Sequence, residues 1–207
     1  MTPTIPPLHY LALGDSYTIG EAVPAHDRWP QDLVRRLRRR GLAIDDPRII
    51  AVTGWTTDEL AAGVDAAALS PSFDLVTLQI GVNNQYRDRP PGEYRLQFTA
   101  LLARAITLAG GRAGHVVVLS IPDWGVTRFG REQARDPARI ARELDGFNAI
   151  ARDEAARAGA RFVDITGISR QHPQLLADDG LHPSAAQYAL WVTAMLPVVW
   201  TAIRPPR

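Results

Sequence analysis

Residues that together can cleave an ester lie near the two ends of this sequence. Gly14-Asp15-Ser16 follows a short apolar run, and Asp179 precedes His182 by three positions close to the other end. A serine hydroxyl is a weak nucleophile until a histidine takes its proton and an acid orients that histidine. The serine and the Asp-x-x-His segment together indicate a serine hydrolase.

Each of these pieces taken alone has a simpler explanation. A serine after Gly-Asp is more often a helix cap, Asn83 is of a type common in turns, and His182 alone is consistent with a helix entry. The order of the pieces along the chain favours catalysis over these explanations. The alternative base is His172, close to Asp178, but the spacing to Asp179 favours His182.

The elements that must position these residues alternate along the chain. Strands are predicted at residues 9–13, 48–53, 74–80, 115–121 and 161–164. Helices are predicted at residues 29–40, from 56 to 62 or beyond, 91–109, 137–158 and 185–199. Thr56 and Glu59 match a capping box at the start of the second helix. The pattern predicts one three-layer α/β/α domain with a five-stranded parallel sheet, in which the most apolar run, 115–121, is central. Residues 1–8 and 204–207 are expected to be flexible ends.

The polar segments follow the predicted strands. Ser16 follows the first strand, Gly54 the second and Asn83 the third, while Asp179 lies in a loop after the fifth. In an open parallel sheet, ligands bind outside the carboxyl ends of the strands. We therefore expect these residues to meet at one edge of the sheet.

Four segments in this order resemble the SGNH/GDSL hydrolase superfamily. The matching segments are Gly14-Asp15-Ser16, Gly54, Gly81-Val82-Asn83-Asn84 and Asp179-x-x-His182. The resemblance extends from residue 14 to residue 182. It implies a flavodoxin-like topology and a GDSL-type esterase or lipase that cleaves carboxylic esters.

The resemblance also implies a role for each matching residue. Ser16 would attack the ester carbonyl, His182 would take and return the proton, and Asp179 would orient the imidazole. The oxyanion would be held by the backbone N–H groups of Ser16 and Gly54 and by the side chain of Asn83. Such donors can surround a developing negative charge, and a glycine lets the backbone approach the substrate.

One residue departs from the family pattern. Asn84 stands where the family usually has aspartate. The position lies outside the triad, so catalysis is expected to survive. The change concerns how the loop is braced, because asparagine accepts hydrogen bonds through its oxygen without supplying a charge.

The substrate pocket is less well defined by the sequence. The candidates next to the motif residues or in the loop after the fourth strand are Tyr17, Trp55, Tyr86, Arg87 and Trp124. Trp124 and Phe129 suit an acyl or aryl pocket, although packing of their loop explains them equally well. Arg87 suits an anionic substrate group, and an exposed salt bridge is the alternative.

Other site classes find no motif in this chain. Gly14–Gly20 lacks a G-x-S-x-G elbow, because Thr18 stands where glycine is required, and it lacks both common phosphate-binding glycine patterns. There is no H-E-x-x-H segment or dense His/Asp cluster. We therefore expect no metal and no cofactor, with a small-molecule ester as the partner.

Composition limits the partners, the covalent links and the cellular location that we expect for this protein. A formal net charge of +1 gives no reason to expect nucleic acid, and the absence of cysteine excludes disulfides and thiolate metal sites. The N-terminal segment lacks the basic and apolar regions of a signal peptide. Residues 188–203 are expected to be too short to span a membrane and are interrupted by Pro197. We expect a cytoplasmic protein without stable membrane insertion. The basic run at 35–40 is interpreted as a solvated helix face rather than a contact with an anionic membrane.

Two alternatives to a small-ester hydrolase stay open at this point. One is a lysophospholipase or thioesterase acting on longer acyl chains. The other is a carbohydrate- or lipid-binding module with a relic triad. The oligomeric state has no signal in the sequence.

Overall fold

Five parallel strands form the centre of the molecule. The computed structural model describes residues 6–70 and 73–204. The strands are β1 (Tyr10–Gly14), β2 (Arg48–Ala51), β3 (Leu75–Gln79), β4 (Val116–Leu119) and β5 (Arg161–Val163). Their order in the sheet is β2-β1-β3-β4-β5, so the predicted five-stranded parallel sheet is confirmed. The middle strand is β3, however, and not the run at 115–121. Both β3 and β4 are completely buried, so apolar content does not distinguish the middle strand from its neighbour.

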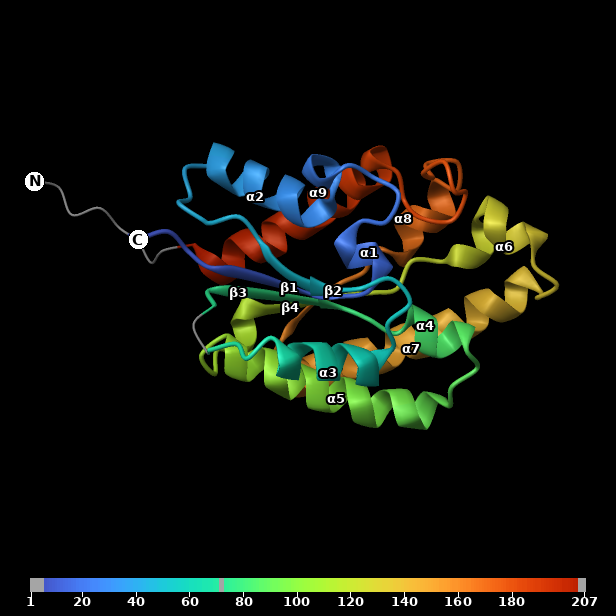
Figure 1. Cartoon of the computed structure of the whole chain (residues 1–207), viewed down its shortest axis with the longest axis horizontal. Helices are drawn as coiled ribbons and strands as arrows, with labels where there is room; N and C mark the ends of the chain where they lie inside the picture. The colour runs from blue at the N-terminus through green and yellow to red at the C-terminus, as the bar shows by residue number, and fades with distance from the viewer. Residues whose placement is uncertain (1–5, 71–72, 205–207) are drawn as a thin grey trace, which may run out of the picture.

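Helices cover both faces of the sheet, which gives the predicted three layers (Figure 1). The helices on one side are α1 (Ser16–Ile19), α2 (Trp29–Arg39), α8 (Thr166–Gln171) and α9 (Ala185–Ile203). Those on the other side are α3 (Thr57–Ala66), α4 (Val82–Tyr86), α5 (Pro91–Leu108) and α7 (Pro137–Ala158). The short α6 (Arg128–Glu132) lies beyond the carboxyl ends of the strands. All five predicted helices are confirmed within a few residues at their ends.

Local signals explain where two of these helices begin. The predicted capping box of α3 is present, since the backbone N–H of Thr56 donates to Glu59 Oε2 at 2.8 Å. Ser184 caps α9 by accepting the backbone N–H of Gln187. Each cap satisfies a backbone donor that has no partner inside the helix.

The expectation that residues 188–203 are too short to span a membrane and are interrupted by Pro197 is corrected by the structure of α9. The helix is 19 residues long and continues through Pro197 to Ile203, and by length and composition alone it is long enough and apolar enough to cross a membrane. A proline inside a helix removes one hydrogen bond without always ending it. Tyr188, Trp191 and Met195 of this helix are buried, and the helix packs against α2. A buried core helix passes the same test, so location stays a prediction.

The arginines of the basic run make contacts within the chain. Arg35 and Arg36 lie 3.0 and 2.8 Å from the carboxylate of Asp32, and Arg40 stacks over the ring of Trp200 at 5.6 Å. Cations near the C-terminal end of a helix also suit its dipole. These contacts support the interpretation of the run as a helix surface.

Residues near the two ends of the described chain make backbone contacts. Leu8 forms a bridge with Ile44 and donates its N–H to Ala43 at 2.9 Å. Arg204 donates its N–H to the carbonyl of Trp200 at 3.0 Å. The flexibility of residues 1–8 and 204–207 stays a prediction. Residues 1–5 and 205–207 of that prediction lie outside the described residues.

The strand order places the functional segments. An order of 2-1-3-4-5 is flavodoxin-like, and its topological switch point lies between β1 and β3, where ligands bind at the carboxyl ends. Ser16 directly follows β1, and Asn83 lies just beyond β3 in α4. The fold therefore brings these two residues to the same edge of the sheet.

Candidate active site

Ser16 lies in a tight turn from strand to helix. It is the first residue of α1, and the side chain of Asp15 caps that helix by accepting the N–H of Tyr17 at 3.0 Å. A side chain at Gly14 would collide with Thr18, because an added Cβ would lie 2.1 Å from its hydroxyl oxygen. Burial raises the pKa of Asp15 to about 7, against the opposing hydrogen bond from Tyr17. The acid next to the serine is therefore a buried helix cap.

Asp179 and His182 orient each other within one turn. His182 Nδ1 lies 2.6 Å from Asp179 Oδ2, while the backbone N–H groups of Leu181 and His182 donate to Oδ1 at 2.9 and 3.0 Å. Gly180 supplies the left-handed backbone of the turn, with φ +73°. Partial burial acts to raise the pKa of Asp179, but the hydrogen bonds from His182 and the backbone outweigh it and lower that pKa. An ionised Asp179 accepts a hydrogen bond from Nδ1–H, which leaves Nε2 of the neutral imidazole as the acceptor nitrogen.

The serine and the histidine share one pocket, which we call the serine pocket. It has a volume of about 180 Å³ and is lined by Ser16, Tyr17, Val82, Asn83, Tyr86, Trp124, Phe129, Leu181 and His182. Ser16 and His182 are not hydrogen-bonded to each other in this structure, as is common in unliganded sites. The rival base His172 directly follows α8 and does not line the serine pocket.

Asn83 lies in α4, and Gly54 lies in the loop between β2 and α3 that α4 contacts. Asn83 lines the serine pocket and donates one N–H of its side-chain amide to the carbonyl of Trp55 at 2.8 Å. Its second N–H remains for another acceptor. Gly54 has φ +87°, and its N–H has no acceptor among the described residues. Gly54 is not among the residues that line the serine pocket, but the Asn83–Trp55 hydrogen bond ties its loop to that pocket.

Asn84 braces the start of α3. The side chain is completely buried, and its Oδ1 accepts the N–H of Thr57 at 3.1 Å while its Nδ2 donates to the Thr57 hydroxyl at 2.8 Å. That hydroxyl in turn donates to Gln97. An amide serves both as donor and as acceptor here, whereas an ionised aspartate accepts only. The departure from the family pattern thus keeps the loop braced by a neutral group.

Aromatic residues form one wall of the serine pocket. The ring of Tyr86 lies 5.4 Å from that of Trp124 and 6.5 Å from that of Phe129, and the Trp124 indole N–H donates to Gln85 at 2.8 Å. On the other side, the ring of Tyr17 stands edge-on to His182 at 5.6 Å. The structure thus places the predicted pocket residues Tyr17, Tyr86 and Trp124 beside Ser16, together with Phe129. Val82 and Leu181 also line the pocket and were not predicted to do so, although both adjoin motif residues.

Two predicted pocket residues point elsewhere. The ring of Trp55 packs against Gly63 of α3, where an added Cβ would lie 2.3 Å from the ring, so the missing side chain leaves room for the indole. Arg87 donates to the carbonyl of Gly54 at 2.7 Å and pairs with Glu59 at 3.4 Å. Neither Trp55 nor Arg87 lines the serine pocket.

A larger groove lies outside the site. It has a volume of about 450 Å³, lies between α6 and residues 173–180, and includes Arg128, Arg131 and Asp178 in its lining. Neither Ser16 nor His182 lines it. The smaller serine pocket is therefore the candidate active site, because it holds the reactive groups.

The sheet order and the serine pocket together are those of a GDSL-type hydrolase with a flavodoxin-like sheet. The chain belongs to the GDSL-like Lipase/Acylhydrolase family, whose model matches residues 12–190. It is accordingly a carboxylic ester hydrolase. The SGNH/GDSL resemblance inferred from the four sequence segments is confirmed.

Individual relatives are more distant. An arylesterase of Vibrio mimicus is 26% identical over 178 residues, which cover 84% of this chain and 78% of that protein. The psychrotrophic esterase EstA of Pseudoalteromonas sp., in a structure inhibited by monoethylphosphonate, has a TM-score of 0.72 and 16% identity, covering 95% of this chain and 99% of its own. A catalytic mutant of Axe2, an acetylxylan esterase of Geobacillus stearothermophilus, has a TM-score of 0.72 and 19% identity, covering 99% and 100%. The two structural likenesses support the fold.

Proposed function

We propose that this chain hydrolyses small to medium carboxylic esters through an acyl-enzyme formed on Ser16. The observation that carries the proposal is the meeting of Ser16, His182 and Asn83 in the serine pocket, with Asp179 2.6 Å from His182 Nδ1. A nucleophile, an oriented base and an amide donor are the groups that acyl transfer needs.

The proposed reaction has two halves. Ser16 Oγ attacks the ester carbonyl while His182 Nε2 takes the hydroxyl proton, and the tetrahedral intermediate then expels the alcohol, which receives that proton. Water next attacks the acyl-enzyme with His182 again as base, and the carboxylic acid leaves as His182 gives that proton to Ser16 Oγ. The oxyanion of each intermediate is stabilised by the N–H groups of Ser16 and Gly54 and by the amide of Asn83.

The size and lining of the serine pocket support small substrates. Its volume of about 180 Å³ is smaller than the ~300–1,000 Å³ typical of sites for drug-sized ligands. The wall formed by Tyr86, Trp124 and Phe129 favours an apolar acyl or aryl group over a charged one. The arylesterase name of the Vibrio mimicus relative agrees with this preference.

The experiment is a comparison of p-nitrophenyl esters of graded chain length. We expect turnover of the acetate and butyrate, with much weaker activity on the octanoate and palmitate. Ser16→Ala should lower kcat by about 10⁴–10⁶-fold. The matched control Ser70→Ala, at an exposed loop serine, should retain the activity of the unmodified chain.

Three other results would contradict the proposal. A preference for the palmitate would favour a long-chain lysophospholipase or thioesterase. Equal labelling of the unmodified chain and of His182→Ala by a fluorophosphonate would exclude His182 as the activating base, and no labelling of either would favour a relic triad.

A further inference from the structure

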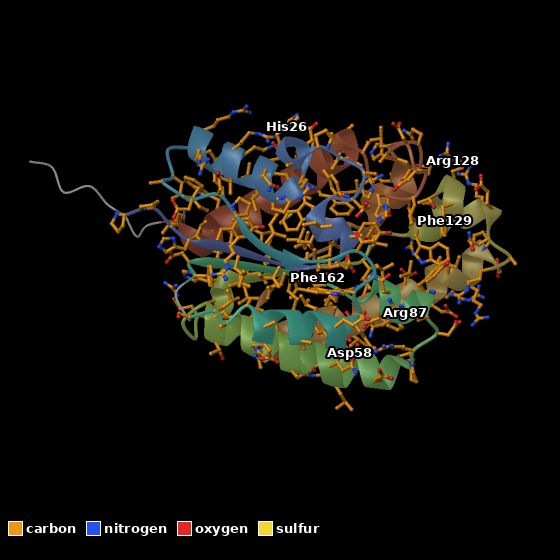
Figure 2. The ribbon with its side chains drawn as sticks, in the orientation of Figure 1. His26, Asp58, Arg87, Arg128, Phe129 and Phe162 are labelled. Carbon is orange, nitrogen blue, oxygen red and sulfur yellow. The ribbon has the colours of Figure 1, made fainter. Side chains whose placement is uncertain are left out.

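The loop between β2 and α3 is held from outside by α4. The carbonyl of Gly54 accepts Arg87 Nη2 at 2.7 Å, and the carbonyl of Trp55 accepts Asn83 Nδ2 at 2.8 Å. Asn83 and Arg87 are four residues apart, a spacing that puts both on one face of a helix. Asn83 of α4 and Arg87, which caps the end of that helix, therefore fix two successive carbonyls of this loop. Figure 2 labels Arg87 close to α3 and α4, at the end of the molecule where α6 carries Phe129.

The guanidinium of Arg87 is itself held in place. Its Nη1 lies 3.4 Å from Glu59 Oε2, and the same oxygen accepts the N–H of Thr56 at 2.8 Å. The backbone hydrogen bond from Thr56, opposed by burial and aided by Arg87, holds the pKa of Glu59 below its usual range. An ionised Glu59 thus orients Arg87 toward Gly54, so that loop, helix start and arginine form a closed ring of contacts.

The backbone at position 54 needs such a restraint because the residue there is glycine. Its φ of +87° lies in a region that glycine enters without steric cost, but glycine also leaves it without cost. With no side chain, Gly54 has no packing to fix its orientation. The hydrogen bond to Arg87 fixes the carbonyl on one side of the Gly54 Cα, and this limits rotation of the N–H on the other side.

We propose that Arg87 is a positioning residue for the oxyanion hole. Arg87 holds the Gly54 backbone so that its N–H points toward the serine pocket. The inference rests on the proposed function of Gly54 as an oxyanion donor. It replaces the expectation that Arg87 binds an anionic substrate group, since Arg87 does not line the serine pocket and one arm of its guanidinium is engaged by Gly54. A group misplaced by about 1 Å can cost about 100-fold in rate, so a loosened donor has a measurable cost.

The kinetic test compares a neutral and an anionic ester in matched variants. In Arg87→Met, we expect kcat to fall about 10- to 100-fold on both p-nitrophenyl acetate and the mono-p-nitrophenyl ester of succinic acid, with KM changed less than about twofold. Arg87→Lys should recover part of the loss, because an ammonium supplies a donor without the planar fork. Arg142→Met, at an exposed arginine that faces Asp136 at 4.0 Å, is the control and should match the unmodified chain.

Other kinetic outcomes would overturn the inference. A raised KM for the succinate ester alone would return Arg87 to substrate binding. An unchanged kcat on both esters would show that Arg87 does not position the oxyanion hole.

Hydrogen exchange separates this inference from the proposed function. In Arg87→Met, the amides of residues 54–57 should exchange faster, while those of β1 and β3 should keep their rates. Unchanged exchange at 54–57 would refute the positioning role even if the chain hydrolyses esters. If the unmodified chain cleaved no ester, the proposed function would fail, and the exchange rates would still decide whether Arg87 holds the loop.

Discussion

The acid–base side of the site and its oxyanion side are built in different ways. Asp179 and His182 lie three residues apart and contact each other within one turn, so local geometry is enough to align them. Gly54 lies in the loop after β2 and Asn83 in α4 after β3, and the Asn83–Trp55 hydrogen bond joins these two segments, which only the order of the sheet brings together. One side of the site depends on a short segment, and the other depends on the order of the sheet.

This difference explains which parts of the site the sequence could predict. The spacing of Asp179 and His182 directly indicated their contact, which the structure contains. The engagement of Arg87 with Gly54 could not be foreseen, because α4 has only five residues and no hydrophobic period to reveal it. The ring of Trp55 was expected in the pocket for its closeness to Gly54, but its place against Gly63 depends on the path of α3.

The same reasoning applies to the fold. Apolar runs and capping residues predicted every strand and each long helix, since those signals are local. The identity of the middle strand depended on long-range pairing, and it was assigned incorrectly. The sequence also did not indicate that α9, which packs against α2, continues through Pro197.

The sharpest test of the acid–base side is Asp179→Asn. The asparagine oxygen can keep the two backbone hydrogen bonds, but its NH₂ group faces Nδ1 and favours the wrong histidine tautomer. We expect kcat to fall by about 10⁴-fold, as in related triads. Steady-state kinetics on p-nitrophenyl acetate measure the loss, and a decrease below about tenfold would contradict the assigned role.

The corresponding test of the oxyanion side is Asn83→Ala. Removal of one oxyanion donor costs about 10²–10³-fold in kcat, less than disruption of the acid–base pair. Part of the loss has a second origin, because Asn83 also fixes the carbonyl of Trp55. If kcat were retained while KM rose, Asn83 would be a ground-state binding residue instead.

A smaller effect tests the backbone of the oxyanion side. Gly54→Ala should lower the free energy of unfolding by about 1–2 kcal/mol, because φ is +87° there. The nearest atom to the added Cβ is Arg87 Nη2 at 3.7 Å, so the cost is conformational rather than steric. The matched control Gly146→Ala lies inside α7 with open space around it and should stabilise by about 0.5–1 kcal/mol. Urea unfolding of both variants checks the opposite signs.

The smallest predicted effect is a pH dependence of the unfolding free energy, which we expect on the acid–base side of the site and not on the oxyanion side. The lowered pKa of Asp179 means that its contribution to stability is present above its ordinary value of 3.8 and is lost as the pH falls through the lowered value. Because Asp179 is about one-third exposed, this contribution should be about 1 kcal/mol or less. The difference in unfolding free energy between the unmodified chain and Asp179→Asn should therefore shrink between pH 7 and pH 3. For Asn84→Ala, at an uncharged residue, the difference in unfolding free energy from the unmodified chain should not change with pH in this way. If that difference shrank equally for both variants, the pH dependence could not be assigned to Asp179.

The path of α9 has a practical consequence for attaching this enzyme to other molecules. The helix begins just after His182 and runs back along the sheet, so that its end at Ile203 and the start of β1 at Tyr10 lie at the edge opposite the site (Figure 1). A label or a solid support attached to a residue near the start of β1 or the end of α9 would therefore lie far from the serine pocket. Immobilisation at these positions should leave substrate access open.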